Sequence, residues 1–244
     1  MATTIVLGDG PLGRAIGSAL EERGSPVRVL GRPSSGRHPM AAFTGADVVV
    51  DASRAHAVAG DVDAALGAGV GRFVIATTGW QADADWVGGA LRRGGAAAVV
   101  APNLALGAAL FLRLVAEAAR LAAAIGGFEP SVMEWHRRSK ADRPSGTARE
   151  IVRRLDAGLP IGVDEVAVVR SGSMPGMHVV GLDGASETIE LRLTARDRSG
   201  YAAGALAAID WLLAEPRSAG LHAFDEVVDD RIAASHSMPM TATA

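Results

Sequence analysis

The sequence has no cysteine among its 244 residues. This absence excludes disulfides, thiolate metal sites and cysteine nucleophiles, and it is typical of proteins from a reducing compartment. Aromatic residues make up only 4% of the chain, which disfavours an aromatic cage for a ligand. The sequence also lacks a long apolar run and a basic N-terminal region followed by an apolar segment. We therefore predict a cytoplasmic protein with neither a signal peptide nor a membrane partner.

A strong charge of one sign is missing as well. The formal net charge is −3, which disfavours nucleic acid as a partner. Hydrophobic residues make up 49% of the chain and thirty residues are glycine, enough for a real core with tight helix–sheet packing. A chain of this length exceeds a single typical domain of about 100–200 residues, so one large or two small domains are expected.

The first hundred residues alternate between short apolar runs and helical patterns. This alternation predicts βαβ units and a parallel sheet of the Rossmann type. The predicted strands are Thr4–Leu7, Val27–Leu30, Asp47–Asp51, Arg72–Ala76 and Ala97–Ala101.

The rhythm changes after Asn103. Long helical patterns cover Ala105–Ile125 and Tyr201–Leu213, and a shorter one covers Ala148–Leu155. Strand candidates then follow one another without helices between them, which predicts an α+β domain with a mixed sheet. These candidates are Ser131–Trp135, Glu165–Ser171, Gly176–Leu182 and Thr188–Ala195.

A glycine fingerprint follows the first predicted strand and opens a helix. It reads Gly8-Asp9-Gly10-Pro11-Leu12-Gly13. The first glycine allows a tight turn, the second lets the backbone approach a pyrophosphate, and the third permits close helix–strand packing. Pro11 suits the first helical position, and the helix N-terminus favours phosphate. The motif predicts a dinucleotide site, and the alternative is a tight turn without a ligand.

The end of the second strand indicates which nucleotide binds. An NAD site carries an acidic residue about 20 residues beyond the fingerprint, but no acid stands here. Arg32 can bind a 2′-phosphate, and Ser34 and Ser35 can donate hydrogen bonds to it. The sequence therefore favours NADPH, with NADH as the alternative cofactor and a solvated Arg32 as the alternative interpretation.

A polar segment, residues 134–147, is the densest group of functional side chains. The spacing of Thr147 and Glu150 is that of a capping box, which would explain a helix start there. It does not explain why cations gather at the positive end of a helix. A bound anion would, because Arg137, Lys140 and the N–H groups after Ser145 can point at a substrate carboxylate.

This segment resembles the 4-hydroxy-tetrahydrodipicolinate reductase (dihydrodipicolinate reductase) family of lysine biosynthesis. The family motif E-x-H-H-x-x-K-x-D-x-P-S-G-T-A is matched by Glu134, His136, Lys140, Asp142 and the run Pro144-Ser145-Gly146-Thr147-Ala148. The resemblance covers nearly the whole chain. Further matches are Thr77-Thr78-Gly79, Ala101-Pro102-Asn103, Arg170-x-Gly172, Gly176-x-His178 and the segment from Gly220 to Asp225.

The resemblance implies a dinucleotide-binding domain formed by residues 1–104 and 217–244, and a substrate-binding and oligomerisation domain formed by residues 105–216. It implies an NAD(P)H-dependent reductase of a small cyclic imine or enamine carboxylate, with a homotetrameric assembly. His136 and Lys140 are then the catalytic candidates, and Arg137, Ser145, Gly146 and Thr147 hold the substrate. The implied cofactor contacts add Ser53, Thr77, Thr78, Gly79 and Asn103 to those of the fingerprint and Arg32.

Three departures from the family keep the substrate open. Arg137 replaces the second histidine of the motif. Leu193 replaces a histidine on a late strand and is followed by Asp197 in place of a serine. The glycine fingerprint is G-x-G-x-x-G, where the family tends to G-x-x-G-x-x-G. Arginine keeps its charge at neutral pH and can grip a carboxylate but cannot donate a proton. The alternatives are therefore a family paralogue that reduces a different imine or enamine in specialised metabolism, and a non-catalytic NADPH-responsive binding module.

The remaining titratable residues carry weaker expectations. His38 and His56 lie in predicted loops and are expected to be solvated. His178 lies in a predicted strand, either facing substrate or satisfied in the core. Asp61 and Asp63 have no partners at metal-ligand spacing, so no metal site is predicted.

Overall fold

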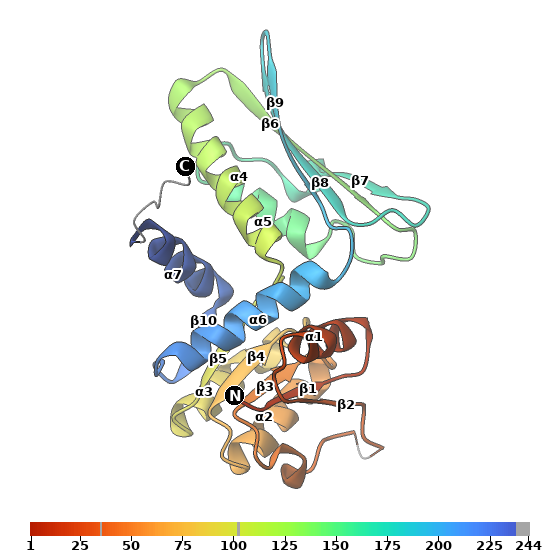
Figure 1. Ribbon diagram of the computed structural model, residues 1–244. Coiled ribbons are helices and arrows are strands. Elements are labelled where there is room, and N and C mark those ends of the chain that lie inside the picture. Colours follow the sequence, from red (N-terminus) through yellow and green to blue (C-terminus); the bar gives the residue numbers. More distant parts are fainter. Residues whose placement is uncertain (35, 102, 238–244) are drawn as a thin grey trace, which may run out of the picture. The chain divides into compact units, whose positions relative to one another are not determined.

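The computed structural model describes residues 1–34, 36–101 and 103–237, so Ser35 and Pro102 lie outside the described residues. The chain forms two compact units (Figure 1). The first consists of Met1–Leu104 and Tyr201–Ala244, and the second of Ala105–Gly200. This division assigns residues 201–216 to the first unit, whereas the expected boundary placed them in the second.

The first unit is built on a six-stranded parallel sheet with the order β10-β5-β4-β3-β1-β2. Its strands are short and largely buried, as expected for a parallel sheet with both faces covered. They are β1 (Thr4–Leu7), β2 (Val27–Leu30), β3 (Val48–Asp51), β4 (Arg72–Ile75), β5 (Ala97–Val100) and β10 (Gly220–Ala223). The five predicted strands agree with these bounds to within one residue. The sixth strand returns from the far end of the chain and pairs with β5.

Helices cover both faces of this sheet (Figure 1). Right-handed crossovers place the helix between β1 and β2 on one face and those between β3, β4 and β5 on the other. The helices of this unit are α1 (Pro11–Glu22), α2 (Val58–Gly67), α3 (Ala84–Arg93), α6 (Ser199–Ala214) and α7 (Phe224–Ser237). Helices α2 and α3 share one core with alternate strand residues such as Ile5, Val49 and Phe73.

The second unit contains a mixed four-stranded sheet in the order β7-β6-β8-β9. Strand β6 is parallel to β7 and antiparallel to β8, and β8 is antiparallel to β9. The elements are α4 (Leu106–Ile125), β6 (Phe128–His136), α5 (Gly146–Leu155), β7 (Ala167–Arg170), β8 (Met177–Gly184) and β9 (Thr188–Thr194). The prediction of a Rossmann-type unit followed by an α+β unit with a mixed sheet is confirmed.

One face of the mixed sheet carries the core of the second unit. Val132 and Val180 pack there against Phe111 and Val115 of α4 and Ile151 of α5. The other face has no helix over it within this unit, and Met133 is 42% exposed on it. None of the helices in the described part of the chain is both long and apolar enough to span a membrane.

Candidate functional site

The turn between β1 and α1 assigns a separate task to each glycine of the fingerprint. Gly8 has φ +100°, and a side chain there would collide with the Ala52 carbonyl. A side chain at Gly13 would collide with the carbonyl of Gly8, so the helix could not approach the strand. A side chain at Gly10 would meet nothing within 4 Å. The turn is therefore tightly packed at Gly8 and Gly13 and open at Gly10. This arrangement lets a phosphate reach the backbone.

A pocket lies beside this turn, where β1 and β3 lead into connections of opposite direction. Such a switch point is the usual ligand crevice of an open α/β sheet. The predicted cofactor residues Gly8, Gly10, Arg32 and Ser53 line it. Pro11 is the first residue of α1, followed by Leu12, and Ser34 is exposed in the loop after β2. Arg54 and His56, which were not among the predicted cofactor residues, also line the pocket.

Asp51 at the end of β3 joins two of the other predicted cofactor residues. One oxygen of its buried carboxylate accepts hydrogen bonds from the Ser53 hydroxyl at 2.7 Å and the Thr77 hydroxyl at 2.6 Å. Burial raises the pKa of Asp51, although these hydrogen bonds act in the opposite direction. Thr77 is thus buried and bonded to Asp51. Thr78 and Gly79 are exposed in the loop after it, and Asn103 is half-buried after β5.

The expectation that His38 is solvated is wrong. The residue is only 6% exposed, and its Nδ1 lies 3.0 Å from the Asp61 carboxylate. Asp61 is 2% exposed and stands in the first turn of α2. The two residues are 23 positions apart, so only the folded chain brings them together. His56 is exposed, as predicted.

In the second unit, the buried carboxylate of Glu134 organises the polar segment. Its Oε1 accepts a hydrogen bond from the backbone N–H of Ser145 at 3.0 Å and from the Arg170 guanidinium at 2.5 Å. The side chains of Glu134 and Arg170 are both fully buried. The same guanidinium donates to the carbonyl of Asp142 at 2.6 Å. One ion pair therefore fixes two points of the loop between β6 and α5.

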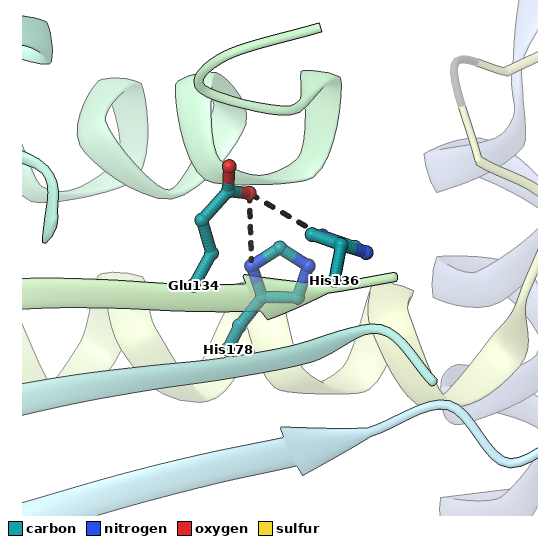
Figure 2. Close-up of side chains that lie close together, drawn as sticks. All are labelled: Glu134, His136 and His178. Carbon is teal, nitrogen blue, oxygen red and sulfur yellow. Dashed lines mark ion pairs between the residues drawn. The ribbon is translucent and has the colours of Figure 1, made fainter. Parts of the chain in front are cut away.

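Two imidazoles turn toward the other oxygen of this carboxylate (Figure 2). His136 Nε2 lies 3.4 Å and His178 Nδ1 lies 4.0 Å from Glu134 Oε2. The two rings are 5.2 Å apart and nearly perpendicular. The antiparallel register explains the meeting, because Glu134 on β6 is directly opposite His178 on β8. Gly176 leaves room for the His136 ring, since a side chain there would lie 2.8 Å from its Cε1 atom.

The buried setting controls the charge of these groups. Burial by itself raises the pKa of Glu134, but the hydrogen bonds from Ser145 and Arg170 outweigh it and the net pKa is lowered. Burial lowers the pKa of His136, with Lys140 and Arg170 adding to the effect and Glu134 opposing it. Burial and the adjacent His136 lower the pKa of His178 to about 4. Near neutral pH this cluster holds a carboxylate and two neutral imidazoles.

Lys140 and Arg137 stand on the loop that Arg170 fixes. Lys140 Nζ pairs with the Asp142 carboxylate at 2.8 Å, and its side chain is 28% exposed. Arg137 is exposed and donates from Nε to the Ser139 hydroxyl at 3.1 Å. Both cations remain accessible to a ligand from solvent.

Helix α5 begins two residues earlier than the capping-box interpretation implies, at Gly146 instead of Ala148. Ser145 is the N-cap, and its hydroxyl accepts from the N–H of Ala148 at 3.2 Å. Glu150 instead pairs with Arg153 and Arg154. The Thr147–Glu150 capping box is therefore a wrong prediction, because Ser145 already caps the helix. Gly146 and Thr147 form its first turn, at the end where the helix dipole favours an anion.

Glu134, His136 and His178 offer three ligand atoms within 4.8 Å of one another, a grouping that could hold a metal ion. The sequence analysis did not predict that His178 lies beside Glu134 and His136, and it predicted no metal site. The carboxylate already binds the Arg170 guanidinium and the Ser145 N–H. A divalent cation would have to share the Glu134 carboxylate with that positive charge, which disfavours metal binding here.

The departure at Leu193 lies next to this cluster. Leu193 on β9 is the register partner of His178, and its side chain packs against the core of the second unit. A hydrophobic side chain thus occupies the position where the family carries a histidine.

Comparison with known proteins agrees with this picture. A sequence profile described as dihydrodipicolinate reductase, C-terminus, matches residues 107–228. The 4-hydroxy-tetrahydrodipicolinate reductase of Methanoregula boonei is 33% identical over 196 residues, covering 75% of this chain and 74% of that protein. The enzyme of the same name from Methanoculleus marisnigri is 35% identical over 190 residues, covering 72% and 74%.

The fold is also found among solved structures. A dihydrodipicolinate reductase from Paenisporosarcina sp. TG-14, with dipicolinate bound, superposes with a TM-score of 0.69 over 91% of this chain and 97% of that one, at 19% identity. The chain combines a Rossmann-type α/β unit with a separate mixed-sheet unit, as that reductase does. Its sequence relatives are named reductases, so the protein is an oxidoreductase. The chain belongs to the dihydrodipicolinate reductase family.

Proposed function

We propose that this enzyme uses NADPH to reduce a small cyclic imine or enamine carboxylate, as a 4-hydroxy-tetrahydrodipicolinate reductase of lysine biosynthesis. One observation carries the proposal. Lys140 is the only lysine in the sequence, whose other twenty-three basic residues are all arginine. It stands on the loop that the buried Glu134–Arg170 pair fixes. A lysine amine can act in acid–base chemistry when its surroundings tune it, whereas an arginine guanidinium stays charged.

The substrate carboxylates are expected at the start of α5. The first turn of this helix, Ser145-Gly146-Thr147, provides a positive dipole end. Lys140 and the exposed Arg137 add two cationic side chains from the preceding loop. Charge-assisted hydrogen bonds of this type bind carboxylates strongly and fix their orientation.

The residues of the first unit fit a phosphorylated dinucleotide. Gly10 leaves open space beside the backbone, and Arg32 and Arg54 line the same pocket. A bound nicotinamide supplies the hydride. Arg32 favours the 2′-phosphate of NADPH, and NADH is the alternative. Ser53, Thr77, Thr78, Gly79 and Asn103 are proposed as further cofactor contacts.

Reduction also requires a proton, and Lys140 is the proposed donor. Lysine has three N–H donors and serves in acid–base catalysis when its surroundings tune it. Because the pKa of His136 is lowered, that imidazole is mostly neutral near neutral pH and donates less readily. We assign His136 to the support of the donor and the substrate, and Arg137 to a carboxylate.

A second candidate function follows from Leu193. Its apolar side chain stands beside His178, at the position where the resemblance implies a histidine. A relative that reduces a less polar imine or enamine in specialised metabolism would fit this change. The same chemistry applies, with a different ring substituent bound near β9.

Assembly and compartment belong to the same proposal. The face of the mixed sheet that carries Met133 and Trp135 is exposed, at 42% and 36% respectively. A homotetramer that packs this face between subunits would cover it. The absence of cysteine supports a cytoplasmic setting.

The decisive experiment follows cofactor oxidation by the purified protein with NADPH and freshly generated 4-hydroxy-tetrahydrodipicolinate. Turnover with this substrate supports the lysine-pathway enzyme. Turnover only with other cyclic imines, tested in a panel, supports the paralogue. Nucleotide binding without turnover on any of them contradicts the proposed function.

A further inference from the structure

His38 lies in the nucleotide pocket but belongs to no predicted site. It lines the pocket together with Arg32, Arg54 and Asp61. Its ring is only 6% exposed and packs edge-on against Phe43, with ring centroids 6.2 Å apart. A buried polar ring in a ligand pocket is a candidate for a role in binding the ligand.

Three contacts join His38 to two separate elements. Its backbone N–H donates to Asp61 Oδ1 at 3.1 Å, and its Nδ1 lies 3.0 Å from the same oxygen. Its Nε2 lies 3.0 Å from the carbonyl oxygen of Gly31. Both ring partners are oxygen acceptors, so the ring bridges Asp61 of α2 and the backbone at the end of β2.

The first consequence concerns charge. Asp61 is buried and lines a pocket that has to accept an anion. A bare carboxylate there would repel a phosphate, whereas the backbone N–H and the ring Nδ1 of His38 both face Asp61 Oδ1 and offset its charge. Arg32 and Arg54 then act on the ligand without opposition from Asp61.

The second consequence concerns position. Gly31 directly precedes Arg32, at the end of β2. The contact from Nε2 to the Gly31 carbonyl fixes the backbone from which the Arg32 side chain reaches into the pocket. A charge-assisted fork is sensitive to such positioning.

We propose that His38 sets the preference of the pocket for nucleotides with a 2′-phosphate, because it covers the Asp61 carboxylate with two hydrogen-bonding groups and holds Gly31 beside Arg32. The inference rests on the proposed function only in that the pocket binds a nicotinamide nucleotide. His38 is a positioning residue, and its effect is confined to the phosphate ester that distinguishes NADPH from NADH.

The test measures dissociation constants for NADPH and NADH by calorimetry, with thermal unfolding to check the fold. His38→Gln removes the ring that contacts Asp61 and Gly31, and so leaves the negative charge of Asp61 less well covered. We expect its dissociation constant for NADPH to rise about tenfold or more, and that for NADH to change less than about threefold. His222→Gln is the matched control, since His222 lies on β10 at the opposite edge of the same sheet. It leaves both constants unchanged.

Asp61 provides the second arm. Asp61→Asn removes the negative charge and keeps an acceptor for His38, so the preference for NADPH stays the same or rises. Added to His38→Gln, it restores most of the lost NADPH affinity. Equal weakening of both cofactors by His38→Gln, or a lower NADPH preference in Asp61→Asn alone, overturns the inference. A wild-type protein that binds neither cofactor refutes the proposed function itself.

Discussion

Arg170 donates to Glu134 across 2.5 Å, with both side chains withdrawn from solvent. The pair lies between neighbouring strands, since His136 of β6 is the register partner of Arg170 on β7. It holds the Asp142 carbonyl and the Ser145 N–H, on either side of Pro144. The loop that presents Lys140 is thus fastened by one buried interaction.

The first prediction concerns that interaction. Glu134→Gln keeps an acceptor for the Ser145 N–H but leaves the Arg170 charge buried without a counterion. Breaking one partner of a buried pair costs about 3 to 5 kcal/mol of unfolding free energy, measurable by urea denaturation. Glu150→Gln on α5 is the control, because its partner Arg153 is 65% exposed. It should cost less than about 1 kcal/mol, and an equal loss in both variants would refute the assignment.

Lys140 yields a prediction that separates charge from proton donation. Lys140→Arg keeps a cation for the carboxylate, so the substrate KM should stay within about threefold, while kcat falls about 100-fold or more. Lys140→Ala removes both the cation and the proton donor, so the substrate KM should rise and kcat should fall, while NADPH still binds. A Lys140→Arg variant with the wild-type kcat would show that Lys140 does not supply the proton.

Because it is the only lysine, Lys140 is also open to selective chemistry. An amine-reactive acylating reagent should modify this side chain and the N-terminus alone, as peptide mass spectrometry can verify. Activity should be lost as Lys140 is acylated. A dicarboxylate such as dipicolinate should slow this acylation. Acylation of Lys140 without loss of activity would contradict its proposed role.

His178 predicts a pH dependence of stability. Its pKa is about 4 in the folded chain and near 6.5 when unfolded, so the unfolded state binds more protons between these values. Its contribution is full above pH 6.5 and is lost as the pH falls toward 4, by up to about 3 kcal/mol. His178→Gln should flatten the change in melting temperature over this window. A wild-type slope in that variant would mean that His178 titrates normally.

The glycine turn predicts two different outcomes for one type of change. Gly13→Ala places a methyl group against the Gly8 carbonyl and should lower the melting temperature. Gly10→Ala meets no protein atom within 4 Å, so the fold should be unaffected while nucleotide affinity falls. Calorimetry together with thermal unfolding separates the two effects. Full nucleotide affinity in Gly10→Ala would argue against phosphate binding at this turn.

Features that are local along the chain could be predicted from the sequence. The strand–turn–helix around Gly8 and the polar run ending at Thr147 depend on neighbouring residues, and the alternation of strands and helices gave the fold class. Contacts between residues that are far apart in the sequence could not be predicted. Glu134 meets Arg170 across 36 positions, and His38 meets Asp61 across 23. A histidine in a loop looks solvated until the fold supplies its carboxylate.

Strand β10 has a consequence for how the protein is made. It enters the parallel sheet beside β5, although more than a hundred residues and the entire second unit separate the two in sequence. During translation the second unit, being continuous, can finish folding while the first still lacks an edge strand. Until Gly220–Ala223 emerges, one side of β5 in the nascent sheet has no partner strand. A premature stop before that point would leave the buried strand β5 as the edge of the sheet, where it is prone to aggregation.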